Sequence, residues 1–373
     1  MKVKITHVIY IPRLSGAEIL VKNLSKHHIS QSHEVSIISL KPVEDSFKQV
    51  KQELESYNVI TSFPKRDVNK LKILFHLTGS LRKHRPDIVV AHSVIPSLYT
   101  RLALKFTKQN YISTISVLHD ASQDDYASSY FQTIEKFLKP SDYVIPLTKR
   151  ASENYKRNCG NRSKVKIIPN GIDLQALSTS TSKRESLRAN VFEAQPSDPI
   201  FLQVGRFNRN KQQHLSIQAF IQSCKSKTFN GKLFLAGLIE DREYFSQLNR
   251  MVNDANLQNK VIFLGPRSDI PDLLSAADVY LMPSSIEAHS IAFLEALANG
   301  ITMVISDIPA FEKGKQFSGV ISLQPENIQQ FARILVQLST NIAIKRWQRD
   351  LSEFSIEKTA DIYLQVFNSL LAV

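Results

Sequence analysis

The chain has 373 residues, of which 43% are hydrophobic and 22% charged, a composition typical of a globular protein with room for two domains. The 11 glycines and 15 prolines follow no repeat period, which excludes collagen, coiled-coil rods and low-complexity disorder, and no run of 18 apolar residues predicts a membrane-spanning helix. The net charge of +13 comes almost wholly from residues 1–180, which hold 27 basic and 15 acidic side chains. This asymmetry predicts that the first half meets an anionic surface, either nucleic acid or a membrane leaflet, with a generally solvated basic surface as the alternative.

Five short apolar runs alternate with helical patterns in the first half. The runs are rich in Val and Ile and span 3–11, 34–40, 87–92, 111–117 and 142–147, whereas 17–29, 68–83 and 97–106 have helical spacing. Strands separated by helices of this length are typical of βαβ units and a parallel sheet. We interpret the first run as a buried strand and not as a signal peptide, because no small-residue cleavage site follows it.

A second series of strands begins after a predicted linker at 164–188, in which Pro169, Asn170 and Gly171 mark a turn. Its apolar runs span 199–205, 232–237, 260–265, 278–284 and 301–307. The pattern predicts an α/β protein with two doubly wound, Rossmann-like domains, residues 1–175 and 176–355. A helical pattern at 356–373 has no strand after it, so this helix is expected to pack back on one of the two domains, either the first or the second. Ligands of such sheets bind beyond the carboxyl ends of the strands, so we expect the site in the cleft between two facing domains.

Two basic residues follow the first strand of the second half. Arg206 comes directly after Gly205 at the end of that strand, and Lys211 lies where a helix is expected to begin. Two cations beside a helix N-terminus are suited to a diphosphate, because they neutralise its charge while backbone amides donate to it. The alternative is a solvated loop with two unrelated basic residues.

Two carboxylates follow a later strand of the same half. Glu287 lies in the loop after Met282-Pro283, and Glu295 lies inside a helix predicted from about Ser290 to Ala298. The amides of His289 and Ser290 lie at the expected helix start, where backbone amides can donate to a ligand, and the two carboxylates are placed to hold two sets of sugar hydroxyls. The alternative is that Glu295 faces solvent and Glu287 complements the helix dipole.

These motifs resemble those of the retaining family 4 glycosyltransferases, which have the GT-B fold of two Rossmann-like domains facing across a cleft. PSSIEAHSIAFLEALANG at 283–300 resembles their E-x7-E motif, and GRFNRNKQQHLSIQAF at 205–220 resembles their phosphate motif. IPNGID at 168–173 resembles the interdomain turn, SGAE at 15–18 the first glycine-rich loop and SVLHD at 116–120 the His-Asp strand end. The resemblance covers nearly the whole chain in the same order.

The resemblance implies a role for each matched residue. Arg206 and Lys211 would bind the diphosphate of a nucleotide-sugar and stabilise the departing nucleoside diphosphate. Glu287 would hold donor-sugar hydroxyls and Glu295 the ribose hydroxyls. The remaining implied residues are Gly16 at the phosphate or acceptor, His119 near the anomeric carbon, Ala288, His289 and Ser290 in the donor pocket, and Asp120 on the acceptor side. The alternative for His119 is a structural histidine whose hydrogen bonds are satisfied at a strand end. His92, which also ends a predicted strand, is a further candidate on the acceptor side.

The chain departs from the family pattern at a few positions. Ala288 and Ser290 stand where relatives often have glycines, Ser15 replaces one glycine of the first loop, and Thr302 replaces a proline. The first two positions shape the sugar pocket. No Asp-x-Asp pair follows a predicted strand, so we expect no metal and no other cofactor.

The activity implied is transfer of a sugar from a nucleotide-sugar, with a UDP-sugar favoured, to a glycan or lipid-linked glycan with retention of anomeric configuration, as in bacterial lipopolysaccharide, capsule or other surface polysaccharide synthesis. The alternatives are a nucleotide-sugar epimerase or a phosphorylase of the same fold, and a non-enzymatic nucleic-acid-binding protein. Against the last, no nucleic-acid recognition motif is present and the charge is not concentrated in one stripe.

The resemblance also suggests a role for the positive charge of the first half. In family relatives the N-terminal domain binds the acceptor, which is often a lipid-linked sugar at a membrane surface. Cysteines 159 and 224 are far apart and indicate a reducing compartment. We therefore expect a cytoplasmic protein, peripheral on the inner face of the plasma membrane. The basic residues expected on helices of this surface are Lys70, Lys72, Arg82, Lys83, Arg85, Arg101, Lys105 and Lys108.

Overall fold

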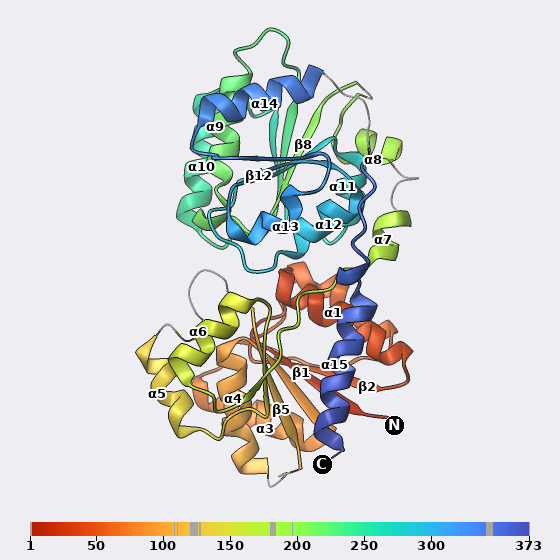
Figure 1. The fold of residues 1–373 in the computed structure, drawn as a ribbon, viewed down its shortest axis with the longest axis vertical. Coiled ribbons are helices and arrows are strands. Elements are labelled where there is room, and N and C mark those ends of the chain that lie inside the picture. The colour runs from red at the N-terminus through yellow and green to blue at the C-terminus, as the bar shows by residue number, and fades with distance from the viewer. Residues whose placement is uncertain are drawn as a thin grey trace. The chain divides into compact units, whose positions relative to one another are not determined.

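The computed structural model describes residues 2–107, 109, 111–119, 126, 128–179, 184–195, 197–340 and 346–372. The chain divides into two compact units, the first made of Met1–Ile172 with Phe354–Val373 and the second of Asp173–Glu353. Each unit contains one parallel sheet with helices on both faces (Figure 1). The prediction of two Rossmann-like α/β domains is confirmed.

The first unit has a seven-stranded sheet in the order β3-β2-β1-β4-β5-β6-β7. Its strands are β1 (Lys4–Ile9), β2 (Glu34–Ser39), β3 (Ile60–Ser62), β4 (Ile88–His92), β5 (Ser113–Leu118), β6 (Tyr143–Pro146) and β7 (Lys164–Val165). Its helices are α1 (Gly16–Ser30), α2 (Lys48–Ser56), α3 (Lys70–His84), α4 (Val94–Thr107), α5 (Ser129–Phe137), α6 (Lys149–Cys159) and α15 (Ile356–Leu371), with a short 3-10 turn at Asp45–Phe47.

Side chains alternate between the two faces of this sheet, as expected for strands. On one face Val8, Ile38 and Val89 pack against α3 and α4. On the other face Ile9 and Ile37 pack against α1 and α2. Both faces are covered, which explains why the strands read as continuous apolar runs rather than alternating ones.

The second unit has a six-stranded sheet in the order β10-β9-β8-β11-β12-β13. Its strands are β8 (Ile200–Val204), β9 (Lys232–Ala236), β10 (Val261–Gly265), β11 (Val279–Met282), β12 (Thr302–Ser306) and β13 (Val320–Leu323). Its helices are α7 (Leu174–Thr179), α8 (Arg184–Asn190), α9 (Gln213–Ser223), α10 (Arg242–Asp254), α11 (Ile270–Ala276), α12 (Ile291–Asn299), α13 (Glu312–Lys315) and α14 (Ile328–Thr340), with 3-10 turns at Arg209–Lys211, Pro309–Phe311 and Ser352–Phe354.

Helices also cover both faces of this sheet. In Figure 1, α9, α10 and α14 lie on one side of it and α11 and α12 on the other. Phe201, Leu233 and Leu281 belong to the core shared with the first group of helices. Phe234, which follows Leu233 and points the other way, packs against Phe192 with ring centroids 4.5 Å apart.

Three short edge or terminal strands escaped the sequence analysis. β3 has three residues and β7 has two, too few for a strand period to be visible. β13 is half-buried at the edge of its sheet. The boundary between the two units, at Ile172 and Asp173, falls inside the segment interpreted as a linker, 164–188, and the described part of this segment also contains β7, α7 and the start of α8.

The C-terminal helix belongs to the first unit, where α15 packs against α1. Its entry is fixed by backbone bonds, from Ile172 N to the Phe354 carbonyl (2.8 Å) and from Ile356 N to the Ile172 carbonyl (2.9 Å). A Cβ on Gly171 would lie 2.6 Å from Thr359 Oγ1 and 2.8 Å from Ile356 Cα. Glycine is therefore required at 171 for α15 to approach this closely. None of the described helices is long and apolar enough to cross a membrane.

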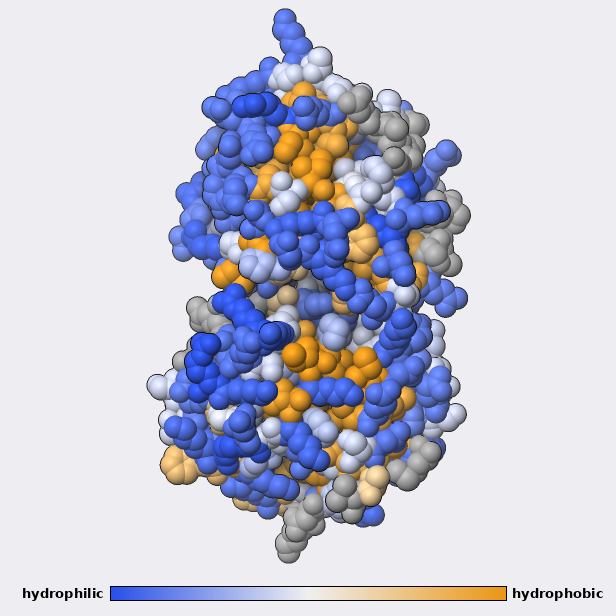
Figure 2. Space-filling model, viewed as in Figure 1, coloured by the Kyte–Doolittle hydropathy of each residue, from blue (hydrophilic) through white to orange (hydrophobic). Residues whose placement is uncertain are grey.

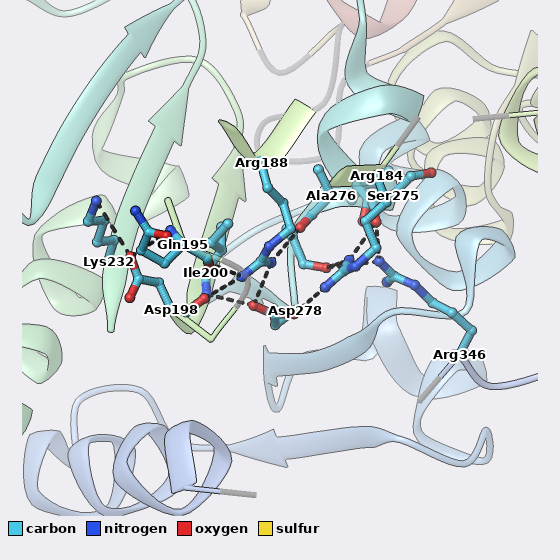
Figure 3. Close-up of polar contacts among 12 residues, drawn as sticks. Arg184, Arg188, Gln195, Asp198, Ile200, Lys232, Ser275, Ala276, Asp278 and Arg346 are labelled. Atoms are coloured by element: carbon cyan, nitrogen blue, oxygen red, sulfur yellow. Dashed lines mark hydrogen bonds and ion pairs between the residues drawn. The ribbon is translucent and has the colours of Figure 1, made fainter. Parts of the chain in front are cut away.

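A buried arginine cluster anchors α8 to the sheet of the second unit (Figure 3). Asp278, just before β11, accepts bonds from Arg184 (2.5 Å), Arg188 (3.1 Å) and the Ile200 amide (2.8 Å). Arg346 and Arg184 both donate to the carbonyls of Ser275 and Ala277 at the C-terminal end of α11. Carbonyls at a helix C-terminus carry partial negative charge and accept readily from cations. These carbonyls therefore supplement Asp278 as acceptors for the guanidinium groups of the cluster.

Replacing Asp278 with alanine is expected to lower the free energy of unfolding by about 3–5 kcal/mol, because it leaves buried guanidinium groups without their counter-charge. The side chain of Asp278 is only 7% exposed. Asp307→Ala is the matched control in the same unit. Asp307 pairs with Lys315 at the surface, and such a pair contributes ~0.2–1 kcal/mol. Equal effects of the two substitutions in urea unfolding would contradict this account of the cluster.

Candidate functional site

Both sheets reverse their strand order at one point, between β1 and β4 in the first unit and between β8 and β11 in the second. At such a point the loops after the two central strands run in opposite directions and leave a crevice at the carboxyl end of the sheet. Arg206 follows β8 and Glu287 follows β11. The strand-end residues singled out from the sequence therefore flank the reversal point of the second sheet.

Lys211 and Glu287 form an ion pair at this point. Lys211 Nζ lies 2.5 Å from Glu287 Oε1, and the side chains are only 17% and 7% exposed. The loops that carry them are also joined by their backbones, since Ser285 N donates to the Asn210 carbonyl at 2.9 Å. The sequence placed these residues at two strand ends, and the fold brings them into contact.

Arg206 pairs with a carboxylate that the sequence analysis missed. It donates to Glu240, which follows β9, and Asn208 Nδ2 donates to the other carboxylate oxygen of Glu240 at 2.7 Å. The Arg206 and Glu240 side chains are each about one-third exposed. The two cations implied for a diphosphate are therefore both held by carboxylates, Arg206 by Glu240 and Lys211 by Glu287.

The loop after β8 is shaped by a close approach of two backbones. A Cβ on Gly237, at the end of β9, would lie 2.0 Å from the Gly205 carbonyl oxygen. Further along the same loop, Gln212 adopts the left-handed conformation with φ 48° between the 3-10 turn and α9. Non-glycine residues in this region are strained and cluster at functional sites.

Tyr280, on β11, contacts the end of β8 and is close to the two glutamates of the E-x7-E motif. Its buried hydroxyl donates to the Val204 carbonyl at 3.3 Å. Burial raises the pKa of Tyr280 well above its usual value, and the charges of Glu287 and Glu295 raise it further. Both carboxylates therefore lie near this ring, and the half-buried Glu295 is on α12 as predicted.

The loop before α12 carries Ala288, His289 and Ser290, all half-buried. Ser290 is the N-cap of α12 and its hydroxyl accepts from the Phe293 amide at 3.4 Å. Burial lowers the pKa of His289 to about 4, and the nearby Lys313 contributes to the shift. His289 is therefore neutral at pH 7.

A second group of predicted residues lies in the first unit. His92 ends β4 and His119 follows β5, and the nitrogens His92 Nδ1 and His119 Nε2 are 2.9 Å apart. His7, in the middle of β1, extends this line, since its Nδ1 lies 3.0 Å from His92 Nε2. Gly16 is exposed at the first turn of α1. Asp120 lies outside the described residues.

Two of the residues that the sequence analysis missed, Glu240 and His7, have sequence positions that could have indicated a functional or hydrogen-bonding role. Glu240 follows Gly237 at the end of a predicted strand, as Arg206 follows Gly205. His7 is a polar residue in an apolar run, a position where a side chain needs a hydrogen-bonding partner. What the sequence does not contain is the identity of that partner, which is 85 residues away along the chain.

Comparison with known proteins gives consistent matches over both units. The family model for glycosyl transferases group 1 matches residues 186–348, and the model for glycosyltransferase family 4 matches residues 14–176. Among curated proteins the chain is similar to a UDP-Gal:alpha-D-GlcNAc-diphosphoundecaprenol alpha-1,3-galactosyltransferase of Escherichia coli. The two are 24% identical, and the alignment covers 96% of this chain and 95% of the other.

Solved structures show the same fold at low identity. A glycosyltransferase from Rickettsia africae ESF-5 matches with a TM-score of 0.77 and 16% identity, over 99% of each chain. HepE of Anabaena, solved in complex with UDP and glucose, matches with a TM-score of 0.75 and 18% identity, over 98% of this chain and 100% of the other.

Acid is expected to destabilise the protein through buried histidines of the first unit. Burial lowers the pKa of His7 to about 3 and of His119 to about 4, and it places those of His28 and His92 well below 6.5. In the unfolded chain these rings titrate near 6.5. Between the two sets of pKa values the unfolded state binds more protons, so the stabilisation is complete above about pH 6.5 and is lost as the pH falls.

Thermal unfolding between pH 7.5 and 5.5 tests this expectation. This interval lies above the range where most carboxylates titrate, so a change in Tm reports mainly on histidines. The wild-type Tm should fall over this interval. His28→Phe, which removes one of the buried rings that must charge on unfolding, should make the slope shallower. A Tm that is constant over the interval in the wild type would contradict the expectation.

Proposed function

Because the chain belongs to family 4 of the glycosyltransferases and has the GT-B fold, we propose that it transfers a sugar from a UDP-sugar to a glycan or lipid-linked glycan. The reaction retains the anomeric configuration, and the product belongs to lipopolysaccharide, capsule or another surface polysaccharide. UDP is favoured because the similar E. coli protein is named for UDP-Gal and HepE was solved with UDP. The diphosphoundecaprenol in the former name supports a lipid-linked acceptor.

The observation that carries this proposal is the pairing of cations and carboxylates at the reversal point of the second sheet. Arg206 and Lys211 bind the diphosphate and stabilise the negative charge that builds on the leaving group. When the diphosphate enters, it takes the place of Glu240 on Arg206 and of Glu287 on Lys211. Glu287 is then released to accept hydrogen bonds from hydroxyls of the donor sugar, while Glu295 binds the ribose.

The residues of the first unit complete the proposed machinery. Gly16 lets backbone amides at the start of α1 approach a phosphate or the acceptor. His119 contacts the donor near its anomeric carbon, and His92 and Asp120 lie on the acceptor side. Ala288, His289 and Ser290 shape the donor-sugar pocket, so they determine which sugar is accepted.

A thermal-shift panel of UDP, GDP, ADP and CMP, each with matching nucleotide-sugars, tests the donor site. A ligand at 100 times its Kd adds roughly 2.7 kcal/mol to the free energy of unfolding. We expect UDP to raise the Tm of the wild type and not that of Arg206→Ala. Arg250→Ala, at an exposed position on α10, is the control and should respond like the wild type. Equal shifts in wild type and Arg206→Ala would contradict the site.

Glu240→Gln separates the role of the carboxylate from that of the loop. Glutamine keeps an acceptor for Asn208 but removes the charge that competes with a diphosphate for Arg206. Because a partly exposed ion pair contributes ~0.2–1 kcal/mol, we expect the affinity for UDP to rise by up to about fivefold, measured by calorimetry. A weaker affinity would mean that Glu240 orients Arg206 for the ligand instead of competing with it.

We further propose that the first unit binds an anionic membrane through α3 and the ends of α4 and α5. Lys70, Lys72, Arg82 and Lys83 lie exposed on α3 together with Leu71 and Phe75, the latter 75% exposed. The ends of α3 and α4 are adjacent, since Arg82 donates to the Phe106 carbonyl. Exposed aromatic rings among basic side chains are suited to the headgroup region of a bilayer.

Two of the basic residues expected on this surface, Arg101 and Lys108, are not part of the surface that the structure describes. Arg101 is buried in an ion pair with Glu135, which also accepts from the Tyr126 hydroxyl, so its assignment to the surface was wrong. Lys108 lies outside the described residues. The aromatic part of the surface, including Phe106 and the 81% exposed Phe137, was not predicted. Apolar residues are also exposed on the face of the molecule that Figure 2 shows.

Co-sedimentation with vesicles tests the membrane proposal. The wild type should bind vesicles containing phosphatidylglycerol at low salt and lose binding as salt is raised, because the headgroup attraction is screened. Phe75→Ser should weaken binding. Ile60→Ser, which removes an exposed apolar side chain on β3 of the same unit, should leave it unchanged. Absence of wild-type binding at low salt would refute the proposal.

A further inference from the structure

Three histidine rings lie in a line across the centre of the first sheet. His7 is on β1, His92 ends β4 and His119 follows β5, and these three strands are neighbours in the sheet. Two ring-to-ring bonds join them, His7 Nδ1 to His92 Nε2 at 3.0 Å and His92 Nδ1 to His119 Nε2 at 2.9 Å. His7 and His92 are buried, whereas His119 at the end of the line is partly exposed.

Each ring in this line is neutral at pH 7. Burial lowers the pKa of His7 to about 3 and that of His119 to about 4, and the pKa of His92 is lowered further by the neighbouring rings on both sides. A neutral imidazole has one N–H donor and one nitrogen lone pair. The two bonds must therefore run in the same direction along the line, because His92 donates one and accepts the other.

Two directions are available, and they differ at the ends of the line. If protons point from His7 towards His119, His7 Nε2 carries a lone pair and His119 carries its proton on Nδ1. In the opposite direction, His7 Nε2 carries a proton and His119 Nδ1 carries the lone pair. The buried end at His7 therefore decides what the partly exposed end at His119 presents.

The surroundings of His7 favour the first direction. Its Nε2 is buried and has no hydrogen-bond partner among the residues that the structure describes. The ring of His28 lies parallel to it with centroids 6.3 Å apart, and no hydrogen bond joins these two rings. A buried N–H without an acceptor is rarer in proteins than an acceptor without a donor. A lone pair at His7 Nε2 is therefore the less costly arrangement.

We propose that His7 and His92 are positioning residues that fix His119 as the tautomer with its proton on Nδ1. His119 then offers its ligand a hydrogen-bond donor and no lone pair, because its Nε2 already accepts from His92. It recognises an oxygen acceptor, either a sugar hydroxyl or a phosphate oxygen. In this state it cannot act as a general base towards an acceptor hydroxyl.

The backbone supports the same arrangement. Ser93, directly after His92, has φ 74°, a conformation rare for residues other than glycine. Its amide donates to the Val117 carbonyl at 2.8 Å, which ties the end of β4 to β5 beside His119. The strained residue thus holds His92 at the register in which its ring reaches His119.

Long-range ¹H–¹⁵N correlation spectra of the ¹⁵N-histidine-labelled full chain test the proposal, since they distinguish the two tautomers of each neutral ring. At pH 7.5 we expect His119 to carry its proton on Nδ1, with an unprotonated Nε2. His119→Asn assigns the signal. A His119 that is protonated on Nε2, or charged, would overturn the proposal, and this readout requires neither substrate nor activity.

His92→Phe replaces the imidazole with an aromatic ring that has no nitrogen and cannot form hydrogen bonds to either neighbour. His119 should then move to the tautomer that free histidine prefers, with the proton on Nε2. His84→Phe, on α3 of the same unit, is the matched control and should leave His119 unchanged. Retention of the Nδ1 proton in a folded His92→Phe would show that the line does not fix the tautomer. If that variant does not fold, the wild-type spectrum still decides the tautomer.

The ligand contact rests on the proposed function and has its own readout. The nucleotide and nucleotide-sugar that stabilise the chain in the thermal-shift panel are added to the labelled protein. A shift of the His119 Nδ1–H signal with the nucleotide-sugar alone assigns the acceptor to a sugar hydroxyl, and equal shifts with both assign it to a phosphate. No shift with a ligand that stabilises the chain refutes the contact, whereas no stabilisation by any ligand refutes the proposed function itself.

Discussion

The candidate donor site of the second unit depends on the parallel pairing of β8 with β9 on one side and with β11 on the other. This pairing brings the ends of three strands to one edge of the sheet, where Arg206, Glu240 and Glu287 follow β8, β9 and β11. The residues are 34 to 81 positions apart in the chain, and only the sheet brings them together. Gly237 is part of the same constraint, because a side chain there would meet the Gly205 carbonyl and separate the strand ends.

Both units contain buried ion pairs, and the first unit also has a line of neutral histidines. The second unit uses charges, with Asp278 among buried arginines at the amino ends of the strands and the Lys211–Glu287 pair at the carboxyl ends. The first unit has the buried Arg101–Glu135 ion pair and also places neutral rings at the centre of its sheet, where His7 and His92 share a hydrogen bond. Removing either partner of a buried ion pair is strongly destabilising, whereas buried neutral histidines make the fold sensitive to acid. The first unit is therefore expected to be the more sensitive of the two to acid.

The ion pairs of the candidate donor site also have a consequence for binding. In the proposed mode of binding, an entering diphosphate does not meet two free cations but replaces two carboxylates, so part of the electrostatic gain is offset by the ion pairs it breaks. For Glu287 this cost is compensated when its carboxylate turns to the donor sugar, because sugar hydroxyls then replace Lys211 as its hydrogen-bond donors. The affinity is then linked to the presence of a sugar as well as a nucleotide, which is the behaviour needed to favour the substrate over the product.

The sequence by itself determined the two-sheet α/β architecture, the strand ends that carry Arg206, Lys211 and Glu287, and the family. It did so because strands buried on both faces are continuous apolar runs and because the residues of each motif are close together along the chain. Only the tertiary structure decided the partners: Glu240 for Arg206, Glu135 for Arg101 and His7 for His92. Each of these pairs is brought together by strand order or helix packing, and a side chain's contacts across a sheet leave no periodic signal in the sequence around it. The edge strands β3 and β7 are too short to show a strand period, so they too became visible only through their neighbours.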